Sequence, residues 1–429
     1  MVRRAVITGL GIVSPLGEGV LENWQKIADG ESGIKNITFF DTNDYPVKVA
    51  GEIHKFNHKK YIDDKFCLEL IFRNVKFALS AARMAIEDSE LETKKVKPEY
   101  FGVITGSGGS GFDGAPFSED ISCGLLKAWD NNFQKFKSRK FGENGQNSVH
   151  PLFLLKMLPN NAIYYLSSKY NIKGENYNIV NTYTGGADAI GRAFRCIGRG
   201  DADIILAGGY DSLIFPNTIF TFYSLNMASL SQNPNRACRP FDLYRDGLVA
   251  SEGAGFLVIE ELEHAKARNA KIYGEIIGYG NAASAYHLFE PCPLGFGLIR
   301  AMERAIENAG ISREKIDYIN ADGIGTIKND RIESIAVKNV FGRHAYKIPM
   351  SSLKGSLGHT GCASGAIETI ISLYSLKKGI ILPTINYENP DPECNLDYVP
   401  NYSRKYKCST FMAINQGIGG QNSALIING

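Results

Sequence analysis

The sequence has almost no excess of charge of either sign. Lysine and arginine number 47 and aspartate and glutamate number 45, so the formal net charge is +2 over 429 residues. Proteins that bind nucleic acid or an anionic membrane through electrostatics carry a clear basic excess. The balance therefore predicts no nucleic-acid partner and no membrane partner.

Long hydrophobic runs are also missing. The apolar stretch at residues 366–376 contains Glu368 and Ser372 and is far shorter than the roughly 20 residues of a membrane-spanning helix. The first residues, Met-Val-Arg-Arg, lead directly into a predicted strand, so we expect no signal peptide. These features predict a cytoplasmic protein.

Paired cysteines are absent as well, since none of the eight stands at C-x-x-C spacing. This pattern argues against a zinc site and a thioredoxin-like site, and a chain of this length does not need a disulfide framework. We expect most of the thiols to be small buried apolar groups. The glycine-rich loops lack a dinucleotide fingerprint and a Walker lysine, so we expect no metal and no bound cofactor.

Glycine is abundant, at 45 residues, or about one residue in ten against a usual ~7%. Glycines end several short apolar runs, such as residues 5–11, 102–106 and 204–209. Between these runs lie helical patterns, for example at residues 68–87. The alternation predicts mixed α/β layers.

Two helical segments resemble each other, at residues 184–200 and 364–379. Each contains a Gly-Ala pair near its start, at Gly186 and Gly365, and each reaches a closing glycine fourteen residues later. Small residues are common at helix starts, so chance is one explanation. We favour a duplicated α/β unit, with a boundary near residues 260–271.

The most polar stretch, residues 127–147, carries no recognisable motif. Its lysines and arginine alternate with aromatic residues. Such a segment could bind an acidic partner, but we expect a solvated flap.

Four glycine-rich loops, each after a predicted strand, carry the polar residues that could take part in catalysis. They present Tyr183 at the start of a buried helix, Asp322, the pair Lys354 and His359, and the glycine loop 415–423. A single histidine before a helix is more often structural than catalytic, but four such loops favour one shared site. A phenol with a pKa near about 10 is a poor acyl acceptor, whereas a thiol at the same helix start would be a good one.

The whole chain resembles the β-ketoacyl synthase (condensing enzyme) family. The resemblance is carried in order by residues 6–17, residues 239–255, Lys354 with Gly358-His359, and residues 419–424. It implies a thiolase-like layered α/β/α/β/α fold made of two similar halves, residues 1–260 and 261–429.

The resemblance fails at the residues that carry the family's chemistry. Active members use a cysteine nucleophile and two histidines. Here the nucleophile position holds Tyr183 and the first histidine position holds Asp322, while the second histidine, His359, and the supporting Lys354 match. We therefore assign no catalytic residue firmly.

Two short motifs, residues 185–189 and 321–323, resemble the chain-length factors, which are the β subunits of type II polyketide ketosynthases. Those subunits usually carry glutamine where this chain has Tyr183. The resemblance implies a non-condensing subunit that forms a heterodimer with a Cys-containing ketosynthase α subunit. That partner would elongate chains carried on the phosphopantetheine of an acyl carrier protein, using malonyl units. The expected lining of the shared tunnel is Tyr183, Thr184, Asp322, His359 and Ile418.

Other functions stay open at this stage. The segment at residues 150–160 looks closer to fatty-acid-type β-ketoacyl-[acyl carrier protein] synthases. A malonyl-carrier decarboxylase that acts alone through His359 is a second alternative. A synthase with a displaced nucleophile would need Cys362, which we expect to pack inside a helix. A structural paralogue that binds acyl carriers is the last alternative.

Overall fold

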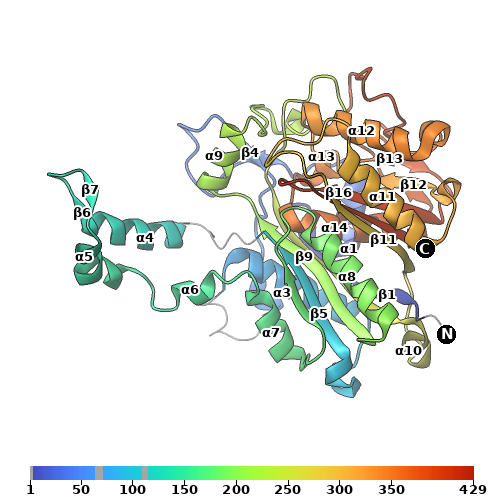
Figure 1. Ribbon diagram of the computed structural model, residues 1–429, viewed down its shortest axis with the longest axis horizontal. Coiled ribbons are helices and arrows are strands. Elements are labelled where there is room, and N and C mark those ends of the chain that lie inside the picture. The colour runs from blue at the N-terminus through green and yellow to red at the C-terminus, as the bar shows by residue number, and fades with distance from the viewer. Residues whose placement is uncertain (1–2, 63–70, 109–114) are drawn as a thin grey trace.

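The computed structural model describes residues 3–62, 71–108 and 115–429 (Figure 1). The start of the helix predicted at residues 68–87, and Cys67, lie outside these ranges. The described part of that helix is α3 (Arg73–Asp88).

A mixed sheet of eleven strands forms the centre of the described structure. In spatial order its strands are β13 (Met350–Ser351), β12 (Tyr318–Asn320), β16 (Thr410–Gln416), β17 (Gln421–Asn428), β11 (Gly274–Ala283), β1 (Ala5–Ser14), β10 (Glu252–Glu261), β9 (Ile204–Ser212), β5 (Phe101–Ser107) and β8 (Asn176–Ile179), with β2 (Gly17–Glu18) beside β1. The pairs at the two outer ends, such as β5 with β8 and β12 with β13, are parallel. The strands near the middle are antiparallel.

Helices pack against both faces of the sheet. Those of the main body are α1 (Val20–Ala28), α3, α7 (Asn161–Tyr170), α8 (Gly185–Arg199), α9 (Pro216–Ser224), α10 (Leu262–Ala267), α11 (Phe296–Ala309), α12 (Ile327–Phe341), α13 (Lys354–Leu357) and α14 (Ser364–Lys378). Short two-stranded pairs lie outside the sheet, β3 (Lys35–Asn36) with β4 (Val49–Ala50) and β14 (Ile380–Ile381) with β15 (Arg404–Lys405). None of the helices in the described ranges has both the length and the hydropathy that crossing a membrane requires.

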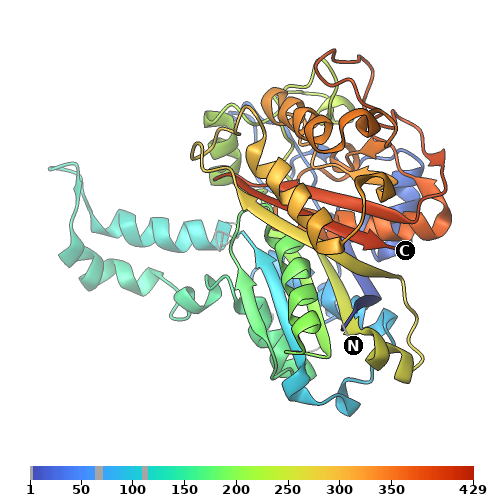
Figure 2. The same cartoon turned by 45° about the vertical axis from the view of Figure 1, so that its right-hand side comes forward.

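Alternate side chains of each strand point to opposite faces of the sheet and pack in separate hydrophobic cores. This alternation explains why helices lie on both sides of the strands. On β10, Leu257 and Ile259 join a central core with α8 and α14, whereas Phe256 and Val258 join an outer core under α3 and α7. A third core packs the other end of the sheet against α11 and α12. Strands buried on both faces read as continuous apolar runs. The two halves of the sheet, which join where β1 pairs with β10 and β11, enclose this central core. The result is the expected thiolase-like order of layers, helix, sheet, helix, sheet, helix, and the fold prediction is confirmed (Figures 1 and 2).

The two helices paired by the internal sequence comparison, α8 and α14, lie against each other in the central layer. A Cβ on Gly186 would stand 2.4 Å from the Cys362 carbonyl oxygen, and a Cβ on Gly365 would stand 2.8 Å from Cβ of Ala187. Both helices end at a left-handed glycine, Gly200 and Gly379. The small residues at the helix starts are therefore needed for close approach.

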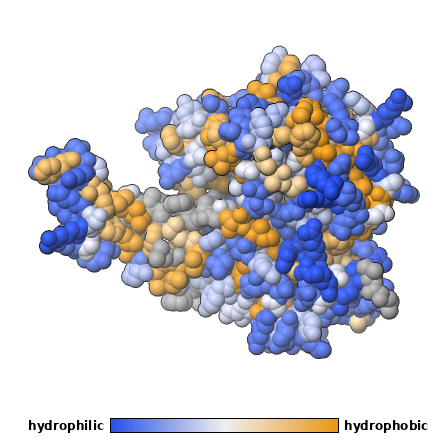
Figure 3. Space-filling view, in the orientation of Figure 1, coloured by the Kyte–Doolittle hydropathy of each residue, from blue (hydrophilic) through white to orange (hydrophobic). Residues whose placement is uncertain are grey.

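The polar stretch at residues 127–147 belongs to an arm that projects from the body (Figures 1 and 2). The arm contains α4 (Ala115–Ala128), β6 (Trp129–Asp130), β7 (Lys135–Phe136), α5 (Ser138–Lys140) and α6 (Phe153–Lys156). It exposes large apolar side chains, including Leu126 and Phe133 (Figure 3). The ammonium groups of Lys135 and Lys137 lie 5.4 and 4.9 Å from the centre of the Phe133 ring. The segment at residues 127–147 is exposed to solvent, as expected for a flap, and it contains short helices, a two-stranded pair and exposed aromatic rings.

Candidate functional site

A strained turn after β8 delivers Tyr183 to the first turn of α8. Thr182 has a positive φ of 45°, which is uncommon for a β-branched residue. The amide of Asn181 donates to Asp188 at 2.6 Å, and the hydroxyl of Thr184 donates to the same carboxylate at 2.8 Å. Thr184 thus stabilises the turn and does not line the pocket described below.

Tyr183 lies edge-on against His359, with ring centroids 4.3 Å apart. Burial, with a smaller contribution from Asp211, raises the pKa of the phenol above its usual value. A phenol that stays protonated is not a nucleophile. The residue at the nucleophile position therefore contributes a ring to the site and no anion.

His359 is held as a neutral ring by its surroundings. Its Nδ1 accepts a hydrogen bond from the backbone N–H of Gly361 at 3.2 Å, so the ring proton is on Nε2. Burial, with the nearby Lys354 ammonium adding to it, lowers the pKa of His359 well below its usual value. Nε2 is buried and has no hydrogen-bond partner among the described residues. The ring therefore presents one unused N–H donor.

Lys354 joins two carboxyl groups in a fully buried cluster. Its Nζ lies 3.1 Å from Oδ1 of Asp322 and 2.8 Å from Oε1 of Glu368. Burial raises the pKa of Glu368 to about 7 and raises that of Asp322, although the ammonium opposes both shifts. The carboxylate of Glu333 accepts the backbone N–H groups of Asp322 and Gly323 at 2.7 and 2.8 Å. These two hydrogen bonds hold the loop that carries Asp322 in place.

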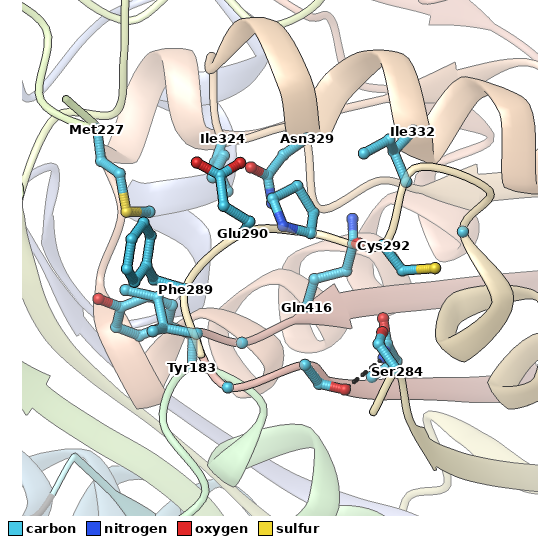
Figure 4. Close-up of a pocket in the computed structure, with 17 residues that line it drawn as sticks. Tyr183, Met227, Ser284, Phe289, Glu290, Cys292, Ile324, Asn329, Ile332 and Gln416 are labelled. Carbon is cyan, nitrogen blue, oxygen red and sulfur yellow. Dashed lines mark hydrogen bonds between the residues drawn. The ribbon is translucent and has the colours of Figure 1, made fainter. Parts of the chain in front are cut away.

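A pocket opens in front of Tyr183 (Figure 4). It is partly open to solvent, and its lining includes Tyr183, Phe289, Ile324 and Ile418. His359 and Asp322 do not line it. The expected site residues therefore divide into two groups: Tyr183 and Ile418 face the pocket, whereas the others lie deeper in the protein.

Cys362 lies at the elbow, the strand-to-helix turn at residues 180–184, although 180 residues separate it from Thr182. Its thiol contacts the Thr182 carbonyl oxygen. The side chain is fully buried, and burial, together with Asp211, raises the pKa of the thiol well above its usual value. A neutral, enclosed thiol is inert, so the site has no activated nucleophile in the described residues.

Sequence reasoning missed Glu333, Glu368 and Gln416. Both glutamates occur within helices, where spacing alone does not distinguish a buried carboxyl group from a solvated one. Gln416 ends β16 and belongs to the glycine loop that the sequence singled out, but nothing in its neighbours marked it as part of a pocket.

The layered fold and a buried His–Lys–carboxyl cluster behind a strand-to-helix elbow define a protein of the condensing-enzyme class. The chain belongs to the β-ketoacyl synthase family. The family's N-terminal domain matches residues 2–265 and its C-terminal domain matches residues 273–388.

Known relatives extend over the full chain. A 3-oxoacyl-[acyl-carrier-protein] synthase 2 from Coxiella burnetii is 41% identical over 99% of this chain and 98% of its own length. The protein of the same name from Staphylococcus aureus strain COL is 37% identical, with the same coverage. Among solved structures, a type II polyketide synthase acyl-carrier protein in complex with its ketosynthase includes a similar chain, with a TM-score of 0.85 and 33% identity. That similarity covers 100% of this chain and 99% of the other.

These findings correct the expected function. The prediction of a chain-length factor is wrong, because the full-length relatives at 37–41% identity are named 3-oxoacyl-[acyl-carrier-protein] synthase 2. A heterodimer with a Cys-containing α subunit is likewise unsupported. The two motifs that suggested a chain-length factor have local structural roles: Asp188 braces the elbow turn and Asp322 pairs with Lys354.

Proposed function

We propose that this chain acts on its own on malonyl groups carried by an acyl carrier protein, within chemistry of the fatty-acid type. It removes carbon dioxide from the malonyl thioester and forms no acyl-enzyme. The names of the relatives support an acyl-carrier-protein substrate, and the geometry of the site supports the type of reaction.

One observation carries the proposal, the unused Nε2–H of a buried neutral histidine. Loss of CO₂ breaks the bond between the carboxyl carbon and C2 of the malonyl group. The electron pair becomes an enolate, whose negative charge lies on the thioester oxygen. A fixed, buried N–H donor stabilises that charge, typically by a factor of 10²–10³ in rate, i.e. about 3–4 kcal/mol. Protonation of C2 from solvent then yields the acetyl thioester.

The absence of acyl transfer follows from the residues at the elbow. The phenol of Tyr183 stays protonated, and the thiol of Cys362 is enclosed and protonated. Condensation requires an acyl group held on a nucleophile, so decarboxylation is the part of the family's chemistry that this residue set supports.

The partner in this proposal is an acyl carrier protein, whose phosphopantetheine delivers the thioester. A complex of such a carrier with its ketosynthase is among the similar structures, which supports this choice. We also propose that residues 1–260 and 261–429 act as the two halves of the site. Tyr183 comes from the first half, and Asp322, Lys354 and His359 come from the second.

The direct test incubates the purified chain with malonyl-carrier protein and follows acetyl-carrier protein by mass spectrometry. We expect turnover by the unmodified chain and a loss of about 10²-fold or more in His359→Ala. His54→Ala, at an exposed histidine away from the site, is the matched control and should keep full activity.

Cys362→Ser separates this reaction from condensation and should turn over normally. An acyl group found on any cysteine, or an acetoacetyl product, would overturn the proposal. So would equal rates in His359→Ala and the unmodified chain.

A further inference from the structure

The pocket contains a buried polar group that the proposed reaction does not use. Gln416, the last residue of β16, is only 8% exposed, and its Nε2 has no hydrogen-bond partner among the described residues. Figure 4 shows its side chain rising from the end of the strand into the space near Glu290, Asn329 and Cys292.

Three other polar side chains of the pocket have partners of their own. The carboxylate of Glu290 lies 2.6 Å from Nζ of Lys328, and Oδ1 of Asn329 accepts the hydroxyl proton of Thr326 at 3.0 Å. The hydroxyl of Ser284 accepts from the Asn422 amide at 3.0 Å. Neither these groups nor any other described residue accepts a hydrogen bond from Nε2 of Gln416.

Much of the remaining wall is apolar, including Phe289, Ile324, Ile332 and Ile418. A buried donor without a partner destabilises the folded protein, and such groups are few in native proteins. A pocket with apolar walls and one free donor fits a ligand that is mostly apolar and carries an oxygen at that point.

We propose that Gln416 donates a hydrogen bond to a neutral carbonyl oxygen of the ligand that fills this pocket. A neutral acceptor fits better than a phosphate or carboxylate, because the Glu290 carboxylate lines the same space. The nature of the ligand rests on the proposed function. In a thioester on an acyl carrier protein, two neutral carbonyl oxygens could accept this hydrogen bond. One is an amide carbonyl of the pantetheine arm, and the other is a keto oxygen on the acyl chain.

The test measures binding and needs no turnover. Calorimetry compares pantetheine, S-butyryl-pantetheine and S-acetoacetyl-pantetheine on the full chain and on Gln416→Met, which keeps the volume but removes the amide. The loss of one hydrogen bond should weaken binding about ten-fold. Weaker binding of all three probes identifies the pantetheine amide, whereas weaker binding of the acetoacetyl probe alone identifies the keto oxygen.

Gln416→Glu is the matched variant, because it keeps the shape and the acceptor oxygens but has no N–H. It should lose as much affinity as Gln416→Met. Full affinity in Gln416→Glu with loss in Gln416→Met would mean that the side chain accepts from the ligand, and would overturn the proposal. Unchanged affinity in both variants, or no binding of any probe to the unmodified chain at millimolar concentration, would also overturn it.

A second measurement shows that the variants fold. Removing an unpaired buried donor should leave the Tm of the ligand-free Gln416→Met protein equal or higher. A clear fall in Tm would show that the amide is paired within the protein and would contradict the proposal. Binding of these probes, together with no acetyl-carrier protein formed from malonyl-carrier protein, would contradict the proposed decarboxylation while leaving the role of Gln416 intact.

Discussion

At the scale of single residues, the elbow combines a large ring with an enclosed thiol. The Tyr183 ring lines the pocket and contacts His359, which does not line it. The substrate therefore reaches the Nε2–H past the edge of this ring, and access to the histidine depends on the size of the side chain at position 183.

Tyr183→Ala should increase the rate of malonyl decarboxylation, because it joins the pocket to His359. The measurement is kcat/KM for malonyl-carrier protein, with Tm recorded to show that the variant remains folded. A folded Tyr183→Ala protein that has lost activity would mean that the ring positions the substrate and does not obstruct it.

The thiol at the elbow should be chemically silent. With iodoacetamide at neutral pH, we expect the exposed Cys123 to be alkylated and Cys362 to remain free, because its thiol is buried and protonated. Peptide mass spectrometry at successive times gives both rates from one sample. Rapid alkylation of Cys362 in the folded protein would instead support a displaced nucleophile.

At the scale of secondary structure, the contact between α8 and α14 places the elbow and His359 in one site. Gly186 lies where α8 meets the turn that carries Cys362, and the space there is too small for a Cβ. Gly198, near the end of the same helix, faces open space. The two glycines therefore allow a matched comparison.

Gly186→Ala should destabilise the protein by about 1–3 kcal/mol, because the added methyl group must push the two helices apart. Gly198→Ala should stabilise it by up to about 1 kcal/mol through higher helix propensity. Urea denaturation of the two variants checks both signs. If Gly186→Ala were as stable as Gly198→Ala, the close approach would not be a constraint.

At the scale of the whole molecule, a buried carboxylate links β1 to the end of β10 and the segment after it. Glu260, at the end of β10, accepts hydrogen bonds from Thr8 on β1, His264 and Arg268. Burial alone would raise the pKa of Glu260, but these hydrogen bonds outweigh it and lower the pKa to about 2. A depressed carboxyl pKa adds stability above the unfolded value near 4.5, and this stability is lost as the pH falls toward 2.

Glu260→Gln should therefore be less stable than the unmodified protein at pH 7, by about 3 kcal/mol, and the difference should shrink as the pH falls from 4.5 toward 2. Denaturant midpoints at several pH values give the comparison. Glu263→Gln, at an exposed neighbour, is the control and should follow the unmodified protein. A Glu260→Gln difference that did not change with pH would contradict the assigned pKa.

Much of the fold follows from local sequence patterns. Apolar runs ended by glycine correspond to β1, β5 and β9, and the two similar glycine-led segments correspond to α8 and α14. Ordered motifs along the whole chain also identified the family. These features could be predicted because each depends on neighbours within a few residues.

The prediction of a chain-length factor was wrong because it depended on sequence patterns that are too short to show tertiary contacts. It rested on two short motifs around Asp188 and Asp322, and short motifs do not reveal what a side chain contacts. Both carboxyl groups have local structural partners, Asn181 and Lys354, which the sequence does not display.

By itself, the sequence determined the family, the order of the layers, and the presence of tyrosine where a thiol nucleophile would stand. Only the tertiary structure decided how these residues act. It brings Cys362 against the Thr182 carbonyl across 180 residues, fixes the His359 proton on Nε2 through a backbone N–H, and leaves the Gln416 amide unpaired in a pocket. The physical reason is that protonation and hydrogen bonding depend on burial and on partners, and in this fold the partners come from distant parts of the chain.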